Sequence, residues 1–382
     1  TILEFCTLKQ EGRIKAVIAT GCLAERYRDE MKKEIPELDA VVGIGSNGKI
    51  CDIIREILLD KQAVCSYGAK TELSMEGGRI ISTEPFYAYI KIAEGCSNNC
   101  TYCAIPSIRG KYRSRRMEDI VKEARWLAEN GVTELVVVAQ DTTRYGEDIY
   151  GKSMLPELLT ALCEIDGFKW IRTLYCYPER ITDELLDVIA KEDKLVKYLD
   201  MPIQHCDKTI LKRMNRHGDR ETLTALIKKI REKIPNVTLR TTLITGFPGE
   251  TEEQFEELCE FVKEIRFERL GCFAYSPEEG TPAEKFEDQV PLKDRERRAE
   301  IIMEEQMIIS DSLNEAALDS EVEVVCEGFD RYAECYYGRS QADAPEIDGK
   351  IFFLSEDKVR VGEYVKVKID DTMDYDLIGS KM

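Results

Sequence analysis

The residues EGCSNNCTYC at positions 94–103 contain three cysteines, Cys96, Cys100 and Cys103, in the spacing C-x3-C-x2-C. They directly follow the apolar run 86–92, which predicts a strand. Glycine and asparagine residues accompany the cysteines, and such residues allow the sharp turns by which a loop wraps its thiolates around a cubane cluster. Three thiolates hold three irons and leave the fourth iron open, as a catalytic metal centre requires. The spacing therefore predicts a four-iron four-sulfur (4Fe-4S) cluster with one open coordination site.

A structural zinc site is the competing interpretation of these cysteines. Zinc prefers four ligands, usually in paired spacing, and the chain has only two histidines, His205 and His217, both distant from the loop in sequence. Tyr102, which precedes the last cysteine, is an aromatic side chain that can shield a cluster. These observations favour the iron–sulfur cluster.

Outward from the loop, apolar runs alternate with segments of helical period. The runs that predict strands are 86–92, 134–140, 170–176, 198–204, 239–245 and 270–276. Such alternation predicts an α/β fold with a parallel sheet, either doubly wound or curled into a partial barrel. Unusual polar sequences follow each run, and in barrels the loops after the strands build the active site. Gln140, Asp141, Gly246 and Glu250 lie in these loops, although each also suits an ordinary turn or cap.

The flanking regions predict two smaller parts. Residues 1–80 have a helix at 1–10, strands at 14–20 and 40–44, and helices through Lys33 and near 47–60, as in part of a small α/β domain ending in a linker at 61–84. Residues 81–318 form the core and end in a long charged helix at about 291–318. Residues 319–382 are β-rich and predict a small antiparallel barrel.

Composition limits the functional class. The chain carries 54 basic and 73 acidic residues, a net charge of −19, which disfavours a dominant role in binding nucleic acid. Fourteen cysteines without a signal peptide indicate reduced thiols and a cytoplasmic enzyme. No apolar run is long enough to predict a membrane helix. Nothing in the pattern requires more than a monomer.

The three-cysteine motif resembles the signature of the radical S-adenosylmethionine (SAM) superfamily. ATGCLAERY (19–27), CAIPSIRGKYRSR (103–115), VAQDTTRYG (138–146), YLDMPIQH (198–205), TGFPGET (245–251) and YSPEEGTPA (275–283) resemble the methylthiotransferase family of that superfamily. The resemblance covers essentially the whole chain. It implies a partial (β/α)6 barrel, a 4Fe-4S cluster on Cys96, Cys100 and Cys103 that binds SAM, and a C-terminal TRAM-like domain. It places Tyr102, Gln140, Gly246 and Glu250 near the cofactor.

Two branches of this family differ in substrate. One modifies an adenosine in transfer RNA, and the other methylthiolates the β-carbon of an aspartate in small-subunit ribosomal protein twelve. VAQDTTRYG and RSQADAPEIDG (339–349) resemble the second branch. Residues 321–382 carry fifteen acidic and eight basic residues, which suits a basic protein better than a polyanion. The resemblance also implies an electron donor such as flavodoxin or ferredoxin.

The family has a second 4Fe-4S cluster, held by three further cysteines. Cys22, in TGCLAER, matches the third of these, and the resemblance places the other two upstream of Thr1. We therefore expect the chain to be truncated at its N-terminus and to hold the radical cluster without a fully ligated second one.

Three alternatives remain open at this stage. The same chemistry on transfer RNA predicts salt-sensitive RNA binding. A zinc-stabilised protein-binding module predicts zinc and no iron. A fragment that cleaves SAM without transferring sulfur would follow from the expected truncation.

Overall fold

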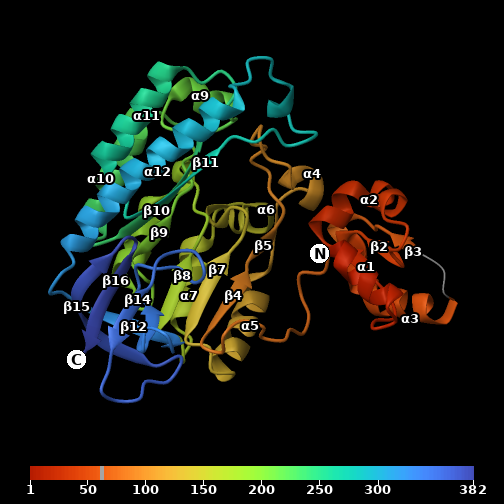
Figure 1. The fold of residues 1–382 in the computed structure, drawn as a ribbon, viewed down its shortest axis with the longest axis horizontal. Helices are drawn as coiled ribbons and strands as arrows, with labels where there is room; N and C mark the ends of the chain where they lie inside the picture. The colour runs from red at the N-terminus through yellow and green to blue at the C-terminus, as the bar shows by residue number, and fades with distance from the viewer. Residues whose placement is uncertain (61–63) are drawn as a thin grey trace. The chain divides into compact units, whose positions relative to one another are not determined.

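The computed structural model describes residues 1–60 and 64–382, which divide into two units (Figure 1). The first comprises Thr1–Arg79, Glu94–Asn99 and Cys103–Arg113, and the second comprises Ile80–Ala93, Cys100–Tyr102 and Ser114–Met382. The division passes through the cysteine loop: Cys96 and Cys103 belong to the first unit and Cys100 to the second.

The first unit contains a small parallel sheet with the strand order β1-β2-β3. Its elements are α1 (Ile2–Gln10), β1 (Ile18–Thr20), α2 (Cys22–Glu34), β2 (Ala40–Val42), η1 (Ile44–Lys49), α3 (Ile50–Asp60), β3 (Val64–Ser66), η2 (Lys70–Glu72) and α4 (Ile105–Arg109). The predicted strands and helices are present. The linker prediction for 61–84 is wrong at β3, because three half-exposed residues carry too little apolar pattern to identify a strand; residues 61–63 of that linker lie outside the described residues.

The second unit contains all six predicted strands of the core. They are β4 (Tyr87–Lys91), β7 (Glu134–Val138), β8 (Trp170–Thr173), β9 (Tyr198–Asp200), β10 (Thr238–Thr245) and β11 (Arg269–Ala274). The strands β4, β7 and β8 form one parallel sheet, and β9, β10 and β11 form another. A parallel bridge between Ile171 and Leu195 continues the order from β8 towards β9. The six strands therefore follow one another in chain order, which is the arrangement of a partial (β/α)6 barrel.

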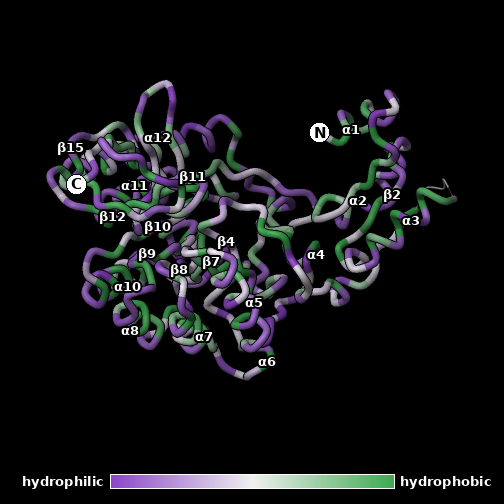
Figure 2. The backbone as a smooth tube through the Cα atoms, turned by 90° about the horizontal axis from the view of Figure 1, so that it is seen from below, coloured by the Kyte–Doolittle hydropathy of each residue, from purple (hydrophilic) through white to green (hydrophobic). Residues whose placement is uncertain are grey.

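Six helices follow the strands and cover their outer side. They are α5 (Met117–Glu129), α7 (Leu155–Cys163), α8 (Asp183–Lys191), α10 (Arg220–Lys233), α11 (Glu252–Ile265) and α12 (Leu292–Glu315). Helices α10, α11 and α12 lie side by side over β9–β11 (Figure 1). Hydrophobic and hydrophilic residues alternate along them (Figure 2), as expected for helices with one buried face. Helix α11 begins with a capping box formed by Thr251 and Gln254.

Short elements connect these strands and helices. They are β5 (Ala93–Glu94), β6 (Arg113–Ser114), η3 (Thr142–Arg144), α6 (Glu147–Tyr150), η4 (Pro178–Arg180), α9 (Lys208–Arg213) and η5 (Ala283–Lys285). Most of them lie in the loops after the core strands, where the sequence predicts the active site.

The C-terminal residues form a closed barrel with the strand order β12-β13-β14-β16-β15. Its strands are β12 (Glu321–Asp330), β13 (Cys335–Arg339), β14 (Ile351–Leu354), β15 (Tyr364–Met373) and β16 (Asp376–Lys381). The prediction of a wholly antiparallel barrel is wrong for one pair, because β14 and β16 run parallel. The hairpin after β15 returns the chain as β16, and this fifth strand closes the barrel against β14.

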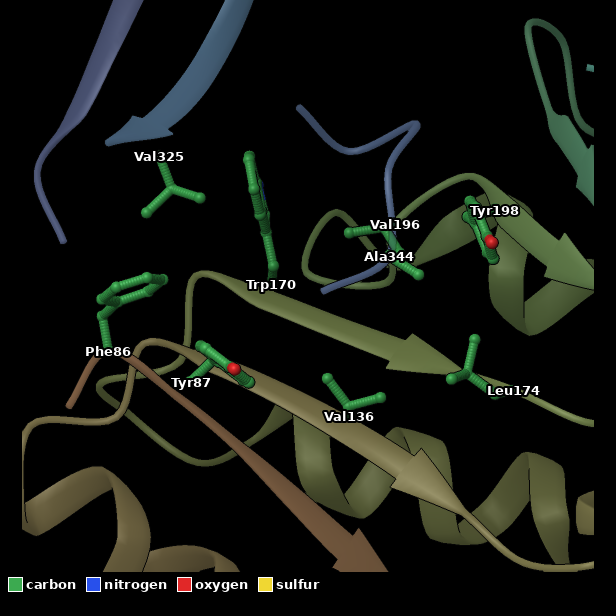
Figure 3. Close-up of a cluster of buried hydrophobic side chains, with 9 residues drawn as sticks. All are labelled: Phe86, Tyr87, Val136, Trp170, Leu174, Val196, Tyr198, Val325 and Ala344. Carbon is green, nitrogen blue, oxygen red and sulfur yellow. The ribbon is translucent and has the colours of Figure 1, made fainter. Parts of the chain in front are cut away.

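The C-terminal barrel and the (β/α)6 core share one hydrophobic cluster. Val325 of β12 and Ala344 of the 340–348 loop pack against Phe86, Tyr87 and Trp170 of the core (Figure 3). The same loop makes polar contacts inside the core: Arg269 donates to Asp343 at 2.6 Å, and the Tyr198 hydroxyl donates to Asp348 at 2.7 Å. This loop, which lies within the sequence RSQADAPEIDG (339–349), therefore anchors the C-terminal barrel to the core.

Candidate active site

The cysteine loop is shaped by backbone contacts specific to its residues. Gly95 has φ +73°, and a Cβ there would lie 2.4 Å from the Lys111 carbonyl oxygen, so only glycine fits. The Cys96 N–H donates to the Gly110 carbonyl at 3.1 Å. Cys96 is buried, and Cys103 is half-buried just before α4. These contacts hold the first-unit part of the loop in a tight turn.

Cys100, in the second unit, is also buried. Its Sγ lies 3.9 Å from the hydroxyl of Tyr177, which follows β8. Every cysteine in the described part of the chain is a free thiol, so all three loop cysteines are available as ligands.

The donor set of this loop fits an iron–sulfur cluster chemically. Three thiols on eight consecutive residues match the ligand type and number of a 4Fe-4S cluster with one open iron. Within residues 1–60 and 64–382, no three His, Cys, Asp or Glu side chains are gathered in an arrangement ready to hold a metal ion. The fit therefore rests on the identity of the donors and on their spacing in the chain.

Tyr102 lies against the aromatic residues that follow β10 and β11. Its ring meets that of Phe247 edge to face at 6.5 Å, and Phe247 meets Tyr275 at 5.2 Å. Burial, followed by the nearby Cys100 thiol, raises the pKa of the Tyr102 hydroxyl well above its usual range. Tyr102 is thus a neutral aromatic side chain close to Cys100, and its shielding role stays a prediction.

Arg216 is a residue of this region that the sequence did not reveal. Its guanidinium carbon lies 4.1 Å from the centre of the Tyr177 ring, and its Nη2 donates to the Pro202 carbonyl at 2.8 Å. Burial lowers the pKa of Arg216, but nearby Tyr102 and Tyr177, then Glu179 and Cys100, raise it by more. The side chain is therefore a buried cation close to a predicted cluster ligand.

Three buried polar groups after the core strands lack hydrogen-bond partners among the described residues. They are Nε and Nη1 of Arg216, Nε2 of His205 and the hydroxyl of Tyr275. Leaving such a group unsatisfied costs about 1–3 kcal/mol. Their position at the carboxyl ends of β9 and β11 marks this end of the core as the side prepared for a ligand.

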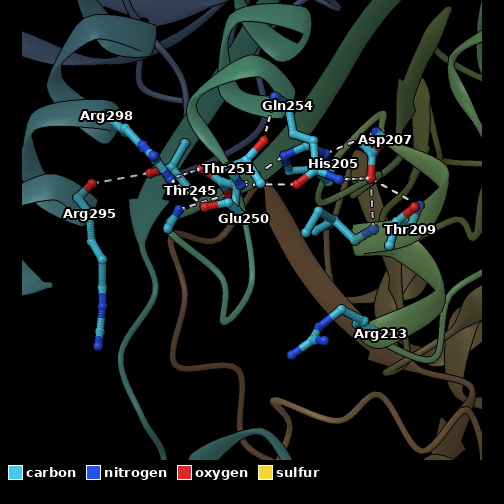
Figure 4. Close-up of polar contacts among 12 residues, drawn as sticks. His205, Asp207, Thr209, Arg213, Thr245, Glu250, Thr251, Gln254, Arg295 and Arg298 are labelled. Carbon is cyan, nitrogen blue, oxygen red and sulfur yellow. Dashed lines mark hydrogen bonds and ion pairs between the residues drawn. The ribbon is translucent and has the colours of Figure 1, made fainter. Parts of the chain in front are cut away.

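The turn after β10 is held from within the protein. Glu250 accepts the Gly246 N–H at 2.8 Å and a 2.8 Å hydrogen bond from Nη1 of Arg298 (Figure 4). His205, whose Nε2 has no hydrogen-bond partner in the described ranges, accepts the Asp207 N–H at Nδ1 at 2.9 Å. Its Nε2 lies 3.6 Å from the Glu250 carboxylate. Both oxygens of Glu250 are thus engaged, and the carboxylate fixes the turn. Gly246, at φ +67°, lies against Arg295, where a Cβ would come within 2.4 Å.

The residues at the end of β7 have different surroundings. Gln140 is exposed. Asp141 is buried and accepts a 2.6 Å hydrogen bond from the Thr143 hydroxyl, while Nε of Arg180 lies 3.6 Å from its other oxygen. Gln140 is free to meet a ligand, whereas Asp141 orders its own loop.

Cys22 begins α2 in the first unit. Its sulfur accepts hydrogen bonds from Nη2 and Nε of Arg109 at 3.0 and 3.2 Å. Arg109 also bonds the buried Glu94 carboxylate at 3.1 Å, so one guanidinium joins α2 to the cysteine loop. The role of Cys22 as a metal ligand stays a prediction, as do the roles assigned to Cys96, Cys100, Cys103, Tyr102, Gln140, Gly246 and Glu250.

Comparison with other proteins identifies the family. The Radical SAM superfamily matches residues 90–262, and the TRAM domain matches residues 320–381. "Ribosomal protein uS12 methylthiotransferase RimO" of Clostridioides difficile is 51% identical over 379 residues, covering 99% of this chain and 85% of the relative. The protein of the same name from Clostridium tetani is 48% identical over 381 residues, with coverages of 99% and 85%.

Among solved structures, the radical SAM methyltransferase TsrM from Kitasatospora setae superimposes with a TM-score of 0.52. It is 15% identical, and the match covers 69% of this chain and 57% of TsrM, so it supports the fold alone. No helix in the described ranges has the length and apolar character needed to cross a bilayer. With relatives of about half identity along nearly its whole length, the chain belongs to the radical SAM methylthiotransferase family of the RimO proteins.

Proposed function

We propose that this protein is a ribosomal protein methylthiotransferase, which replaces a hydrogen on the β-carbon of an aspartate in protein uS12 with a methylthio group. The observation that carries this proposal is the 51% identity to a uS12 methylthiotransferase over 99% of the chain. The C-terminal barrel, with fifteen acidic and eight basic residues in 321–382, suits a basic protein substrate.

The thiolates of Cys96, Cys100 and Cys103 would hold the radical cluster, and Tyr102 would exclude water on the side of Cys100. When bound, the cluster and SAM supply a 5′-deoxyadenosyl radical that removes a hydrogen atom from the substrate carbon. Abstraction by a carbon radical requires no general base, so His205 is assigned no proton transfer. Gly246 and the turn held by Glu250 would offer backbone groups to the adenosyl part of SAM, and Gln140, exposed after β7, would contact the cofactor.

The second cluster of the family pattern receives no step here. We infer that Cys22 is one ligand of that cluster. The electron donor is a flavodoxin or a ferredoxin, the protein acts as a cytoplasmic monomer, and neither a membrane nor a nucleic acid is its partner.

The proposal is tested by anaerobic reconstitution with iron and sulfide, followed by incubation with SAM, dithionite and purified uS12. We expect at least about four irons per chain, formation of 5′-deoxyadenosine, and a tryptic uS12 peptide heavier by one methylthio group. Modification of transfer RNA with unmodified uS12 would contradict the substrate, and zinc without iron in folded protein would contradict the enzyme.

A further inference from the structure

Tyr175, the second residue after β8, has an unusual backbone conformation. Its φ is +62°, in the left-handed region that bulky side chains rarely adopt. The conformation costs free energy, and it persists only where the surrounding structure holds it. Strained residues of this kind gather at active sites and ligand clamps, so Tyr175 is a candidate for a functional role.

The backbone of Tyr175 is fixed by residues at the ends of two other strands. Its N–H donates to the buried carboxylate of Asp200, the last residue of β9, at 3.0 Å. Its carbonyl accepts the N–H and the hydroxyl of Thr142, which follows β7, each at 3.1 Å. Asp200 is held in turn by Arg240 of β10 at 2.8 Å. The core thus keeps an aromatic residue in a conformation that glycine adopts at lower cost.

The side chain of Tyr175 lies on the inner side of the core. Burial, followed by Asp200, raises the pKa of its hydroxyl, and Arg240 lowers it by less. Burial is also the main cause of the raised pKa of Tyr89 on β4, to which Tyr175 contributes. Strands β7 and β8 separate β4 from β9 in the order of the core. A phenol that acts on groups of both β4 and β9 therefore lies within the curve of the strands, and it carries its proton at neutral pH.

The phenol of Tyr175 is open to a ligand. The side chain is 40% exposed, whereas Leu174 and Cys176 on either side of it are buried. Its hydroxyl makes no hydrogen bond to any residue of the described chain. Two residues further on, the Tyr177 hydroxyl lies 3.9 Å from the sulfur of Cys100, a predicted cluster ligand. A free phenol donor therefore lies inside the core, in the loop that borders the predicted cluster.

We propose that Tyr175 is a specificity-determining residue whose hydroxyl donates a hydrogen bond to the side-chain carboxylate of the target aspartate. This inference rests on the proposed function. The reacting β-carbon is bonded directly to that carboxylate, so the carboxylate must enter the core together with it. The nearby cation, Arg240, is already paired with Asp200, which leaves the phenol as an open donor. A hydrogen bond to a charged acceptor is about twice as strong as one to a neutral amide.

The test compares the full reconstituted chain with its Tyr175→Phe variant, which loses the hydroxyl and keeps the ring. Tyr150→Phe is the control, because Tyr150 of α6 is exposed to a similar extent, 41%. Fluorescence anisotropy measures the affinity for labelled uS12 and for uS12 with asparagine at the target position, under anaerobic conditions with SAM at saturation. Formation of 5′-deoxyadenosine without uS12 is measured in parallel and shows whether the cofactor site is intact.

We expect Tyr175→Phe to weaken the binding of uS12 about 10- to 100-fold, the range for a hydrogen bond to a charged group. Binding of the asparagine form should weaken less, so the preference of the wild-type chain for aspartate falls. Formation of 5′-deoxyadenosine without uS12 and the affinities of Tyr150→Phe should not change. Wild-type affinity in Tyr175→Phe, or an equal loss for both forms of uS12, overturns the inference.

Tyr175→Gly covers the case in which Tyr175→Phe does not fold. Glycine adopts a φ of +62° without strain, so the loop is retained while the phenol is lost. The same loss of preference is expected, and wild-type affinity and preference in Tyr175→Gly also overturn the inference. Wild-type protein that binds no iron, forms no 5′-deoxyadenosine or does not bind uS12 instead refutes the proposed function.

Discussion

Arg339, at the end of β13 in the C-terminal barrel, donates a 2.7 Å hydrogen bond to Glu134, the first residue of β7 in the core. Both side chains are buried, and Arg172 donates to the other oxygen of Glu134 at 3.0 Å. One carboxylate thus lies between two cations that are 205 and 38 residues away from it in the chain. The C-terminal barrel is therefore fixed to the core by a charge network as well as by apolar packing.

Replacing Glu134 with Gln should strongly destabilise the second unit. The change leaves two buried guanidinium groups without their shared carboxylate, and breaking a buried ion pair costs about 3–5 kcal/mol. Both tryptophans, Trp126 and Trp170, belong to the second unit. Unfolding in guanidinium chloride, followed by tryptophan fluorescence, therefore measures the unfolding free energy of that unit.

A surface pair provides the control for that measurement. Lys169 and Glu323 also join the core to the barrel, at 2.6 Å, but are 41% and 37% exposed. Glu323→Gln should change the unfolding free energy by less than about 1 kcal/mol. Equal losses for the two variants would show that the buried network contributes no more than a surface contact.

Cys100→Ala should abolish iron binding at the loop and the formation of 5′-deoxyadenosine. Two thiolates cannot replace the three that the cluster requires. Iron analysis and chromatography of the SAM products measure the two effects. Cys51→Ala, which removes an exposed thiol from α3, should leave both unchanged. Continued production of 5′-deoxyadenosine by Cys100→Ala would refute the ligand assignment.

Buried thiols should make the fold sensitive to alkali. Burial raises the pKa of Cys176 from 9.0 to about 12 and that of Cys163 from 9.0 to about 11. Between these values the folded chain keeps a proton that the unfolded chain has lost. The unfolding free energy therefore falls as the pH rises, by about 1.4 kcal/mol per pH unit for each such group.

Denaturation at several pH values tests this with two variants. Cys176→Ala should make the unfolding free energy fall less steeply with pH between pH 9.0 and about 12. Cys163→Ala should have this effect only between pH 9.0 and about 11. If both variants keep the wild-type slope across this range, the thiols do not cause the alkaline loss.

Gly246→Ala should destabilise the turn after β10 by about 3 kcal/mol. An alanine there adopts an unfavourable positive φ, and its Cβ overlaps the backbone and side chain of Arg295. Gly280 has a similar φ of +76° with no atom within 4 Å of an added Cβ. Gly280→Ala should therefore cost only about 1 kcal/mol. The melting temperatures of both variants separate the cost of the Cβ clash from the cost of a positive φ. Similar melting temperatures would show that an alanine at Gly246 does not clash with Arg295.

The order of the core strands and the cysteine loop were predictable from local pattern. β7 (ELVVV) is a nearly continuous apolar run because it is buried on both faces, and turn residues follow each core strand. The spacing of Cys96, Cys100 and Cys103 carries its own chemical meaning, since ligands eight residues apart or less must share a loop. Short strands with little apolar pattern, such as β3 and β16, escaped detection, and the parallel pairing of β14 with β16 has no local signature.

The sequence by itself therefore determined the fold class and the family resemblance, and it predicts the cysteine ligands, because each depends on residues that are near one another in the chain. Only the tertiary structure placed Arg216 beneath Tyr177 and Glu134 between Arg172 and Arg339. Whether a buried charge has a partner depends on which distant segments meet around it, and that is decided when the whole chain packs. The same reason explains why Glu250, predicted to lie near the cofactor, has its carboxylate engaged by Arg298 and Gly246.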